Sequence, residues 1–239
     1  MSASNPHNAS AIQELIAAEA RAQQLLDECV RQQAIVAGTT ERALSERVFA
    51  IAAAMFGVKR YWHKRIVRAG RNTVLPYAAN PPDLTIQADD IVFFDFGPVF
   101  GDWEADVGRT IVVGDDPRKH QLAADVARGW DLAAEYFRAH PDITAAELYR
   151  HVGELARRSG WDQGHVHCGH VVGRFPHEKE LDDETVYLRA DNPRPLRRPG
   201  LTGQPLRWIL EIHFVDPARE FGGFQEALLL EADEVDLAK

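Results

Sequence analysis

The chain has 239 residues, of which 45% are hydrophobic, and a formal net charge of −9 at pH 7. This length suffices for one large domain with a substantial core. The acidic balance argues against nucleic acid or an anionic membrane as a partner. The only cysteines, Cys29 and Cys168, do not form a CxxC motif, so a reducing, cytoplasmic location is expected.

Residues 1–9 are polar and lack the basic and apolar segments of a signal peptide, so we expect a disordered tail. The longest apolar run, Val48–Phe56, is far shorter than the ~18 residues that a membrane span needs. The remaining residues, 10–239, are expected to form a single domain.

Two helices are predicted near the start of the chain. Ser10–Gln33 is rich in Ala, Leu, Glu and Gln and contains neither Gly nor Pro, which favours a long helix. Thr39 or Thr40 can cap a second helix, with Glu41 favourably placed in its first turn. Gly57 ends this helix.

The next segments predict strands. Lys59–Ala69 mixes aromatic and β-branched residues with basic ones and is expected to be a strand, whereas Asn72–Asp83 contains three prolines and is expected to be a loop. Ile91–Val113 has two apolar runs around a Gly- and Pro-containing loop, which indicates an antiparallel hairpin. Asp95 lies inside the first run and Asp106 at the start of the second, so the hairpin brings both carboxylates into one space.

Two more helices follow the hairpin. Asp116 is an N-cap followed by Pro at the first helical position, and this helix is expected to run to about His140. Thr144 and Glu147 form a capping box for the next helix, which Gly160 ends.

The last third of the chain predicts further strands. Asn192–Gln204 is rich in Pro, Gly and Arg and is expected to be an exposed loop. Arg207–Val215 alternates between two faces and places Glu211 opposite an apolar face. Phe224–Leu230 is a final strand that carries Glu226. Helices and strands do not alternate regularly, so the fold class is α+β.

Five ionisable residues lie in apolar strands: Asp95, Asp106, His170, Glu211 and Glu226. An ionised carboxylate there is costly unless it is paired or binds a metal. For the hairpin alone, an alternative is that Asp95 caps the turn and Asp106 pairs with Arg109. Taken together, four carboxylates and one imidazole suit Mn, Fe, Co or Zn, and four carboxylates suit two ions better than one.

The order of these residues resembles that of the pita-bread metallopeptidases, which include methionine aminopeptidase, aminopeptidase P, prolidase and the metal-free creatinase. The matching segments are Asp95-Phe-Gly97, Asp106-x-x-Arg109-Thr110, Gly169-His-Val-Val-Gly173, His177-Glu178, Glu211 and Glu226. Gly38-Thr-Thr-Glu41 fits best with the aminopeptidase P branch. The resemblance covers residues 10–235 and implies a curved, mostly antiparallel sheet backed by helices, with a pseudo-two-fold axis and one catalytic domain.

The resemblance implies a dinuclear hydrolase, of the Xaa-Pro aminopeptidase or dipeptidase type, that acts on a short peptide or small amide. Asp95 would bind one ion, Asp106 and Glu226 would bridge both ions, and His170 and Glu211 would complete the second site. A metal-bridging water would attack the substrate carbonyl, Glu211 would carry its proton, and His177 would bind the carbonyl oxygen. His165, His167 and His213 are candidates for supporting these groups. A homodimer is compatible with the family.

The chain also departs from the family pattern. Members usually carry a histidine on the loop before the first ligand strand, and Pro76 stands at about that position here. His63 is nearby in the sequence, but the pattern does not place it in the pocket. The usual Glu-Pro after the fourth ligand is Glu211-Ile212 in this chain. These departures leave two alternatives open: the same metal site used to cleave a C–N or C–S bond of a small metabolite, and a binding module without activity.

Overall fold

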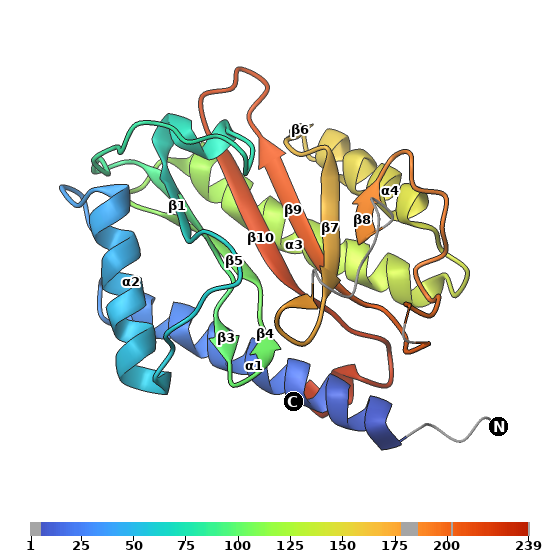
Figure 1. The fold of residues 1–239 in the computed structure, drawn as a ribbon. Coiled ribbons are helices and arrows are strands. Elements are labelled where there is room, and N and C mark those ends of the chain that lie inside the picture. Colours follow the sequence, from blue (N-terminus) through green and yellow to red (C-terminus); the bar gives the residue numbers. More distant parts are fainter. Residues whose placement is uncertain (1–5, 178–185, 202, 239) are drawn as a thin grey trace.

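A computed structural model of the chain describes residues 6–177, 186–201 and 203–238 and combines α-helices with one large antiparallel sheet (Figure 1). The helices are α1 (Pro6–Arg31), α2 (Glu41–Phe56), α3 (Pro117–Ala139) and α4 (Ala145–Arg158). The strands of the large sheet are β1 (Ile66–Ala69), β2 (Ile91–Phe96), β5 (Val107–Val112), β6 (Asp162–Gln163), β7 (His167–Val172), β8 (Tyr187–Arg189), β9 (Arg207–Val215) and β10 (Gly222–Leu229). The predicted α+β class is confirmed.

Capping residues set the helix ends as predicted. The Thr40 side chain accepts a hydrogen bond from the Ala43 N–H at the start of α2, and Gly57 ends α2 with φ +66°, a conformation that glycine adopts without steric cost. Thr144 and Glu147 form the predicted capping box of α4. A cap of this kind stabilises a helix by about 1 kcal/mol.

Helix α1 corrects one prediction. It begins at Pro6 rather than at Ser10, so residues 6–9, which were expected to belong to a disordered tail, are helical. Proline suits the first helical position because its missing N–H would have no partner there. Residues 1–5 lie outside the described part of the chain.

The sheet is built from two halves that meet at its centre. Its strand order is β1-β2-β5-β10-β9-β7-β8, and β6 pairs with β9. In the first half, β1, β2 and β5 run in chain order from the edge to the centre. In the second half, β7, β9 and β10 also run in chain order toward the centre, with β8 outside β7 at the edge. Two helices precede the strands in each half, which is the arrangement that a pseudo-two-fold axis produces.

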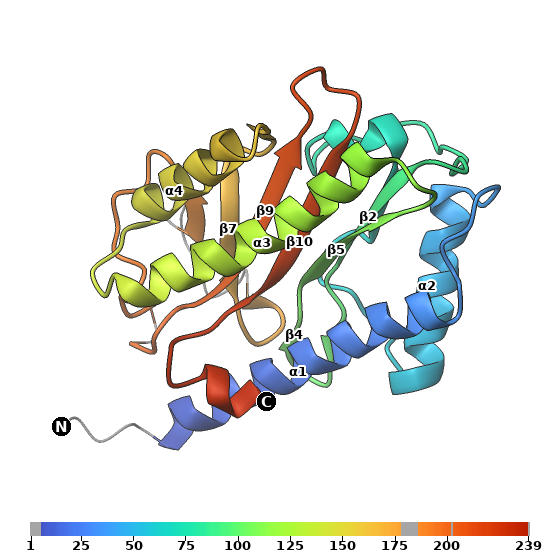
Figure 2. The ribbon, with the colours of Figure 1, turned by 180° about the vertical axis from the view of Figure 1, so that it is seen from behind.

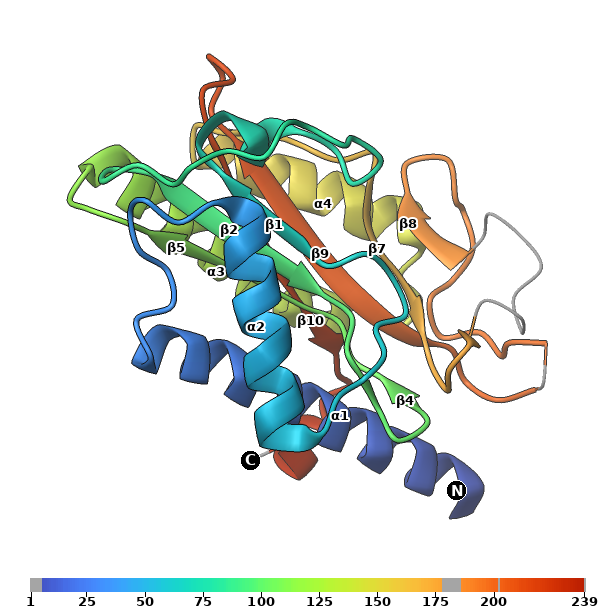
Figure 3. The same ribbon diagram turned by 60° about the vertical axis from the view of Figure 1, so that its left-hand side comes forward.

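The helices lie on one face of the sheet. In Figure 2, the view from behind, α3 crosses in front of β5, β10 and β9, and α4 lies beside it over β7. Figure 3 shows α1 and α2 beside the strands of the first half. The opposite face of the central strands is not crossed by any of the four described helices (Figure 1). None of the described helices is long and apolar enough to span a bilayer.

Strand β9 shows how the sequence divides the two faces. Trp208, Leu210, Ile212 and Phe214 are buried in the core that α3 and α4 share with the sheet, as their alternation predicts. Burying a side chain of this kind contributes about 1.5–3 kcal/mol. The residues between them, which include Glu211 and His213, face the other side of the sheet.

The predicted strand Lys59–Ala69 is correct only in its last four residues. Ile66–Ala69 pairs with β2, whereas the segment before it leaves the sheet and crosses the end of β2, where the Trp62 N–H donates to the Gly97 carbonyl (2.9 Å). The predicted hairpin Ile91–Val113 is confirmed as the β2–β5 pair. Its loop contains a second small hairpin of β3 (Val99–Phe100) and β4 (Trp103–Glu104).

Candidate metal centre

Three carboxylates lie in one row across the open face of the sheet. Asp95 on β2 is opposite Gly108 on β5, Gly108 is opposite Glu226 on β10, and Glu226 is opposite Glu211 on β9. Directly opposed residues of antiparallel strands project from the same face. Gly108 keeps the middle of the row open, because a Cβ there would lie 2.5 Å from the Phe224 ring and 2.9 Å from Glu226 Cβ.

Asp106 and His170 complete the predicted group. Asp106 immediately precedes β5, and its Oδ2 lies 3.1 Å from His170 Nε2, which is 3.9 Å from Glu226 Oε1. Asp106, His170 and Glu226 therefore offer three ligand atoms to a single position. Arg109, the alternative partner of Asp106, instead donates to Asp27 (2.6 Å) and to Gln23 on α1.

These side chains line one cavity of about 480 Å³. Its lining contains all five predicted ligands, together with Trp62, His63, Tyr77, His167, Val171, His177, Val186 and Tyr187. The prediction that the five converge is confirmed. The four carboxylate residues are between 1% and 8% exposed, so water screens their charges little, and a cation would remove their mutual repulsion.

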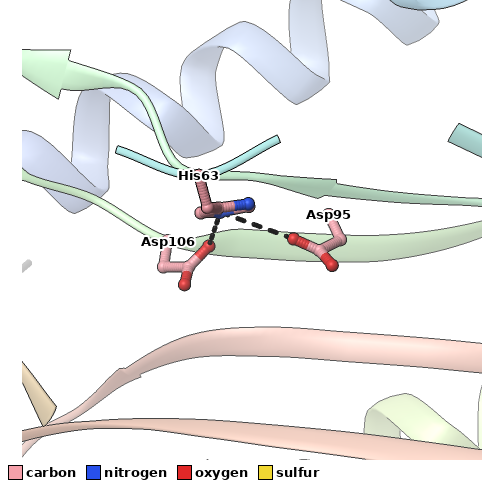
Figure 4. A group of neighbouring side chains, drawn as sticks. All are labelled: His63, Asp95 and Asp106. Carbon is pink, nitrogen blue, oxygen red and sulfur yellow. Dashed lines mark hydrogen bonds and ion pairs between the residues drawn. The ribbon is translucent and has the colours of Figure 1, made fainter. Parts of the chain in front are cut away.

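His63 belongs to the same cavity, which the sequence did not reveal. Its Nε2 lies 3.0 Å from Asp106 Oδ1 and 3.5 Å from Asp95 Oδ1 (Figure 4). These three residues form a second group that could hold an ion. The sequence gives only a weak indication that His63 enters the cavity, which is the glycine at position 97. A Cβ at this position would lie 2.4 Å from His63 Nε2.

The loop in which relatives of this type are expected to carry a histidine supplies an aromatic ring instead. Tyr77, next to Pro76, lines the cavity, and its ring lies 5.9 Å from the His63 ring. The imidazole on this side of the cavity therefore comes from the segment before β1 rather than from the loop before β2.

The charged groups of the cavity shift one another's pKa values. Burial raises the pKa of Asp95 to about 7 and that of Glu226 well above its ordinary value. Burial also opposes the charged forms of His63 and His170, but Asp106, helped by Asp95 at His63 and by Glu211 at His170, raises both pKa values to about 9. Against the cost of its own burial, the two imidazoles hold the pKa of Asp106 well below the usual range. Bound protons thus balance the negative charge of the buried carboxylates, as a divalent cation would.

His177 stands at the rim of this group and is fixed by Glu104. The Glu104 carboxylate accepts hydrogen bonds from the backbone N–H of His177 (3.2 Å) and from its ring Nδ1. The His177 ring lies 5.1 Å from Trp62 and 6.5 Å from His170. Since Nδ1 donates to the carboxylate, Nε2 is the ring nitrogen left for a substrate. Glu178, the neighbour of His177 in the predicted motif, lies outside the described residues.

Two further histidines lie beside Glu211, and a third, His213, packs against the ring of His165. His167 Nδ1 lies 2.5 Å from Glu211 Oε1, and His165 Nδ1 lies 3.9 Å from Glu211 Oε2. Burial lowers the pKa of His165 to about 4 and that of His213 well below its ordinary value. His213 Nε2 donates to the Thr73 carbonyl (2.7 Å), so this ring fixes the loop after β1.

The donor atoms fit a divalent cation. Glu226 Oε2 is buried and has no hydrogen-bond partner among the described residues, and a carboxylate oxygen left in that state is costly unless a cation meets it. Oxygen donors with a few imidazole nitrogens suit a transition-metal ion.

The chain matches known metallopeptidases. The sequence model of Metallopeptidase family M24 matches residues 13–202. The Xaa-Pro dipeptidase of Lactobacillus helveticus is 30% identical over 146 residues, which are 61% of this chain and 39% of the relative. That of Pyrococcus furiosus is 29% identical over 146 residues, 60% of this chain and 41% of the relative. The chain thus spans about two fifths of the length of these curated relatives.

Solved structures show the same fold. Prolidase from Pyrococcus furiosus superposes with a TM-score of 0.68 at 23% identity, and the superposition covers 91% of this chain and 61% of the prolidase chain. Methionine aminopeptidase from Thermotoga maritima gives a TM-score of 0.70 at 19% identity and covers 93% of both chains. The pita-bread fold expected from the sequence is therefore confirmed.

Proposed function

Because the chain belongs to Metallopeptidase family M24, we propose that it is a metal-dependent hydrolase of short peptides, of the Xaa-Pro dipeptidase or aminopeptidase type. The observation that carries this proposal is the convergence of four buried carboxylates and an imidazole on one cavity. A cavity of about 480 Å³ lies within the range of ordinary small-ligand sites and suits a dipeptide. The relatives named as Xaa-Pro dipeptidases favour peptide hydrolysis over C–N or C–S cleavage of another metabolite.

We propose two divalent ions, with Mn or Co ahead of Fe or Zn. Asp95 would bind one ion, Asp106 and Glu226 would contact both, and His170 and Glu211 would complete the second. When bound, such ions supply Lewis acidity and make water a stronger acid. The combined charge of two divalent ions balances that of four carboxylates, so all four can remain ionised together in a buried site.

The remaining residues of the cavity would orient substrate and move protons. Glu104 holds His177 through Nδ1. In its doubly protonated form the ring would donate from Nε2 to the oxygen of a substrate carbonyl, where negative charge develops during hydrolysis. Glu211 would carry a proton toward the leaving amine. His167, 2.5 Å from Glu211 Oε1, would keep that carboxylate in place.

The test is metal content together with activity. Purified protein would be analysed for bound metals and assayed on Xaa-Pro and Met-Xaa dipeptides before and after chelation. We expect Xaa-Pro cleavage that the chelator abolishes and Mn or Co restores. Asp95→Asn should lose both metal and activity, whereas Glu154→Gln, an exposed position on α4, should retain both. A metal-loaded protein that cleaves none of these peptides would refute the proposal.

We also propose that the protein is cytoplasmic and forms a homodimer. Both cysteines, Cys29 and Cys168, are buried and unpaired with each other, which suits a reducing compartment. Light scattering after size-exclusion chromatography gives the oligomeric state, and a mass of a single chain would rule out the dimer.

A further inference from the structure

The group formed by His63, Asp95 and Asp106 is not accounted for by the five expected ligands. His63 Nε2 contacts both carboxylates, and the side chain of His63 is only 7% exposed. An imidazole buried between two carboxylates has two explanations. It is either a ligand to an ion that the carboxylates share, or a cation that takes the place of that ion.

The distances suit ligands of one ion. Ligands at ~2.0–2.2 Å from a common ion lie roughly 2.8–3.6 Å apart when they subtend about 90–110° at the metal. His63 Nε2 lies 3.0 Å from Asp106 Oδ1 and 3.5 Å from Asp95 Oδ1 (Figure 4). Both separations therefore fall in the range that two donors around a single ion adopt.

The second ring nitrogen of His63 has the partner that a ligating histidine needs. Nδ1 lies 2.7 Å from the carbonyl oxygen of Lys64, so Nδ1 donates there, and Nε2 would offer its lone pair to an ion that replaces the Nε2 proton. His170 has the same arrangement, with Nδ1 2.9 Å from the carbonyl of Val171. A hydrogen bond of this kind fixes the ring and raises the basicity of the ligating nitrogen.

His63 and His170 also divide the two oxygens of Asp106 between them. Asp106 Oδ1 faces His63 at 3.0 Å, and Oδ2 faces His170 at 3.1 Å. If Asp106 bridges two ions, each ion then has one imidazole on its side of the bridge. On the five-ligand assignment, only the ion near His170 would have one.

The His63 ring has little freedom to leave this position. It lies over Gly97, where a Cβ would lie 2.3 Å from the ring, and its centroid is 4.4 Å from that of Trp62. A nitrogen ligand that is held in place before the ion arrives loses little conformational entropy on binding.

We propose that His63 is a sixth protein ligand of the metal centre and gives the ion held by Asp95 an imidazole of its own. The inference rests on the proposed dinuclear site, although it concerns metal binding and not the substrate. A nitrogen donor at this ion favours later transition metals such as Co and Zn over Mn and Mg. The site would therefore bind Co more tightly relative to Mn than a site with carboxylates alone.

The first experiment measures metal stoichiometry and affinity. Metal-free parent, His63→Ala and His63→Gln would be titrated with Co²⁺ by calorimetry, with bound metal checked by elemental analysis. We expect two ions in the parent and, in both variants, one site weakened at least tenfold while the other is retained. His120→Ala, an exposed histidine on α3, is the matched control. Circular dichroism identifies a variant that fails to fold, in which case His63→Gln carries the comparison.

The second experiment identifies the nitrogen directly. In the Co²⁺ form, the ring N–H protons of ligating histidines give strongly shifted exchangeable proton NMR signals. The parent should show two such signals and His63→Ala one fewer. Two ions at parental affinity in His63→Ala, with both signals kept, would overturn the proposal. So would a variant that binds more ions than the parent, which would make His63 a substitute for an ion.

These results separate the inference from the proposed function. A parent that binds two Co²⁺ ions through two imidazoles but cleaves no peptide would retain the ligand assignment and reject the function. A parent that binds no metal ion would reject both.

Discussion

The Glu104 carboxylate accepts two hydrogen bonds from one residue, His177, through the backbone N–H and the ring Nδ1–H. Glu104 lies on β4, in the loop of the β2–β5 hairpin, and is 1% exposed. The small hairpin inside that loop therefore fixes the orientation of an imidazole that comes from a distant part of the chain. Glu104 is thus a positioning residue, and its effect on activity should act through His177.

His177→Ala should separate catalysis from metal binding. If the imidazole donates to developing charge on the substrate, its loss should lower kcat by ~10²–10³ while metal content stays near that of the parent. His170→Ala should lose metal and activity together, because His170 Nε2 is 3.1 Å from Asp106 Oδ2. Elemental analysis beside turnover distinguishes the two. A His177→Ala protein without metal, or with parental turnover, would show that this role is wrong.

Glu104→Gln should give a weaker version of the same effect. The amide can still accept the backbone N–H, but it lacks the negative charge that stabilises a doubly protonated ring, so fewer rings present an Nε2–H to the substrate. We expect kcat to fall by ~10–100-fold with KM and metal content nearly unchanged. Adding Glu104→Gln to His177→Ala should then cause no further loss, whereas additive losses would indicate an independent role for Glu104.

Metal removal should destabilise the fold. The carboxylates of the cavity are almost wholly buried and repel one another when ionised. A chelator should lower Tm, and Mn or Co should restore it by mass action, by about 2.7 kcal/mol when the free ion is at 100 times its Kd. Asp95→Asn should reduce this dependence. Identical melting curves with and without chelator would argue for a binding module without metal.

Local interactions explain which elements could be predicted from the sequence. Thr40, Asp116 and Thr144 cap their helices through hydrogen bonds within a few residues, so these starts were predictable. Strand β9 was predicted to its exact bounds because its alternation separates a helix-covered face from an open one. The five expected ligands were recognisable because charged residues are rare in such buried strands.

Contacts between distant segments explain what the sequence did not reveal. His63 reaches the cavity because the segment before β1 leaves the sheet over Gly97, and nothing in the local pattern of Lys59–Ala69 indicates this departure. Glu41 was expected only to favour a helix start. It is 6% exposed and accepts hydrogen bonds from the Ala69 N–H (2.7 Å) and the Asn72 side chain, which joins α2 to the loop that borders the cavity.

Gly108→Ala tests the row of carboxylates. A methyl group at this position would lie 2.5 Å from the Phe224 ring and 2.9 Å from Glu226 Cβ, so strand β10 must shift. Overpacking of this kind costs about 1–3 kcal/mol of unfolding free energy, and the displaced Glu226 should weaken metal binding. Gly173→Ala is the matched control, because its nearest contact is an ordinary 3.5 Å. Equal stability and metal affinity of the two variants would contradict the close packing at Gly108.

Glu19 on α1 should make stability depend on pH. Burial raises the pKa of Glu19 from its ordinary 4.5 to about 8, although Gln23 donates a hydrogen bond to it. Between these two values the folded chain keeps a proton that the unfolded chain has released. The unfolding free energy contributed by this group therefore falls as pH rises from about 4.5 to 8, by up to ~1.4 kcal/mol per pH unit, and changes no further above that range.

Glu19→Gln removes this titration, since an amide does not ionise. Urea unfolding of the chelated parent and variant from pH 5 to pH 9 should therefore give curves that diverge, with the variant gaining stability relative to the parent up to about pH 8 and a constant difference above it. Glu14→Gln, exposed on the same helix, is the matched control, and its curve should run parallel to that of the parent. A Glu19→Gln curve that is also parallel to the parent would mean that Glu19 is already ionised in the folded chain at neutral pH.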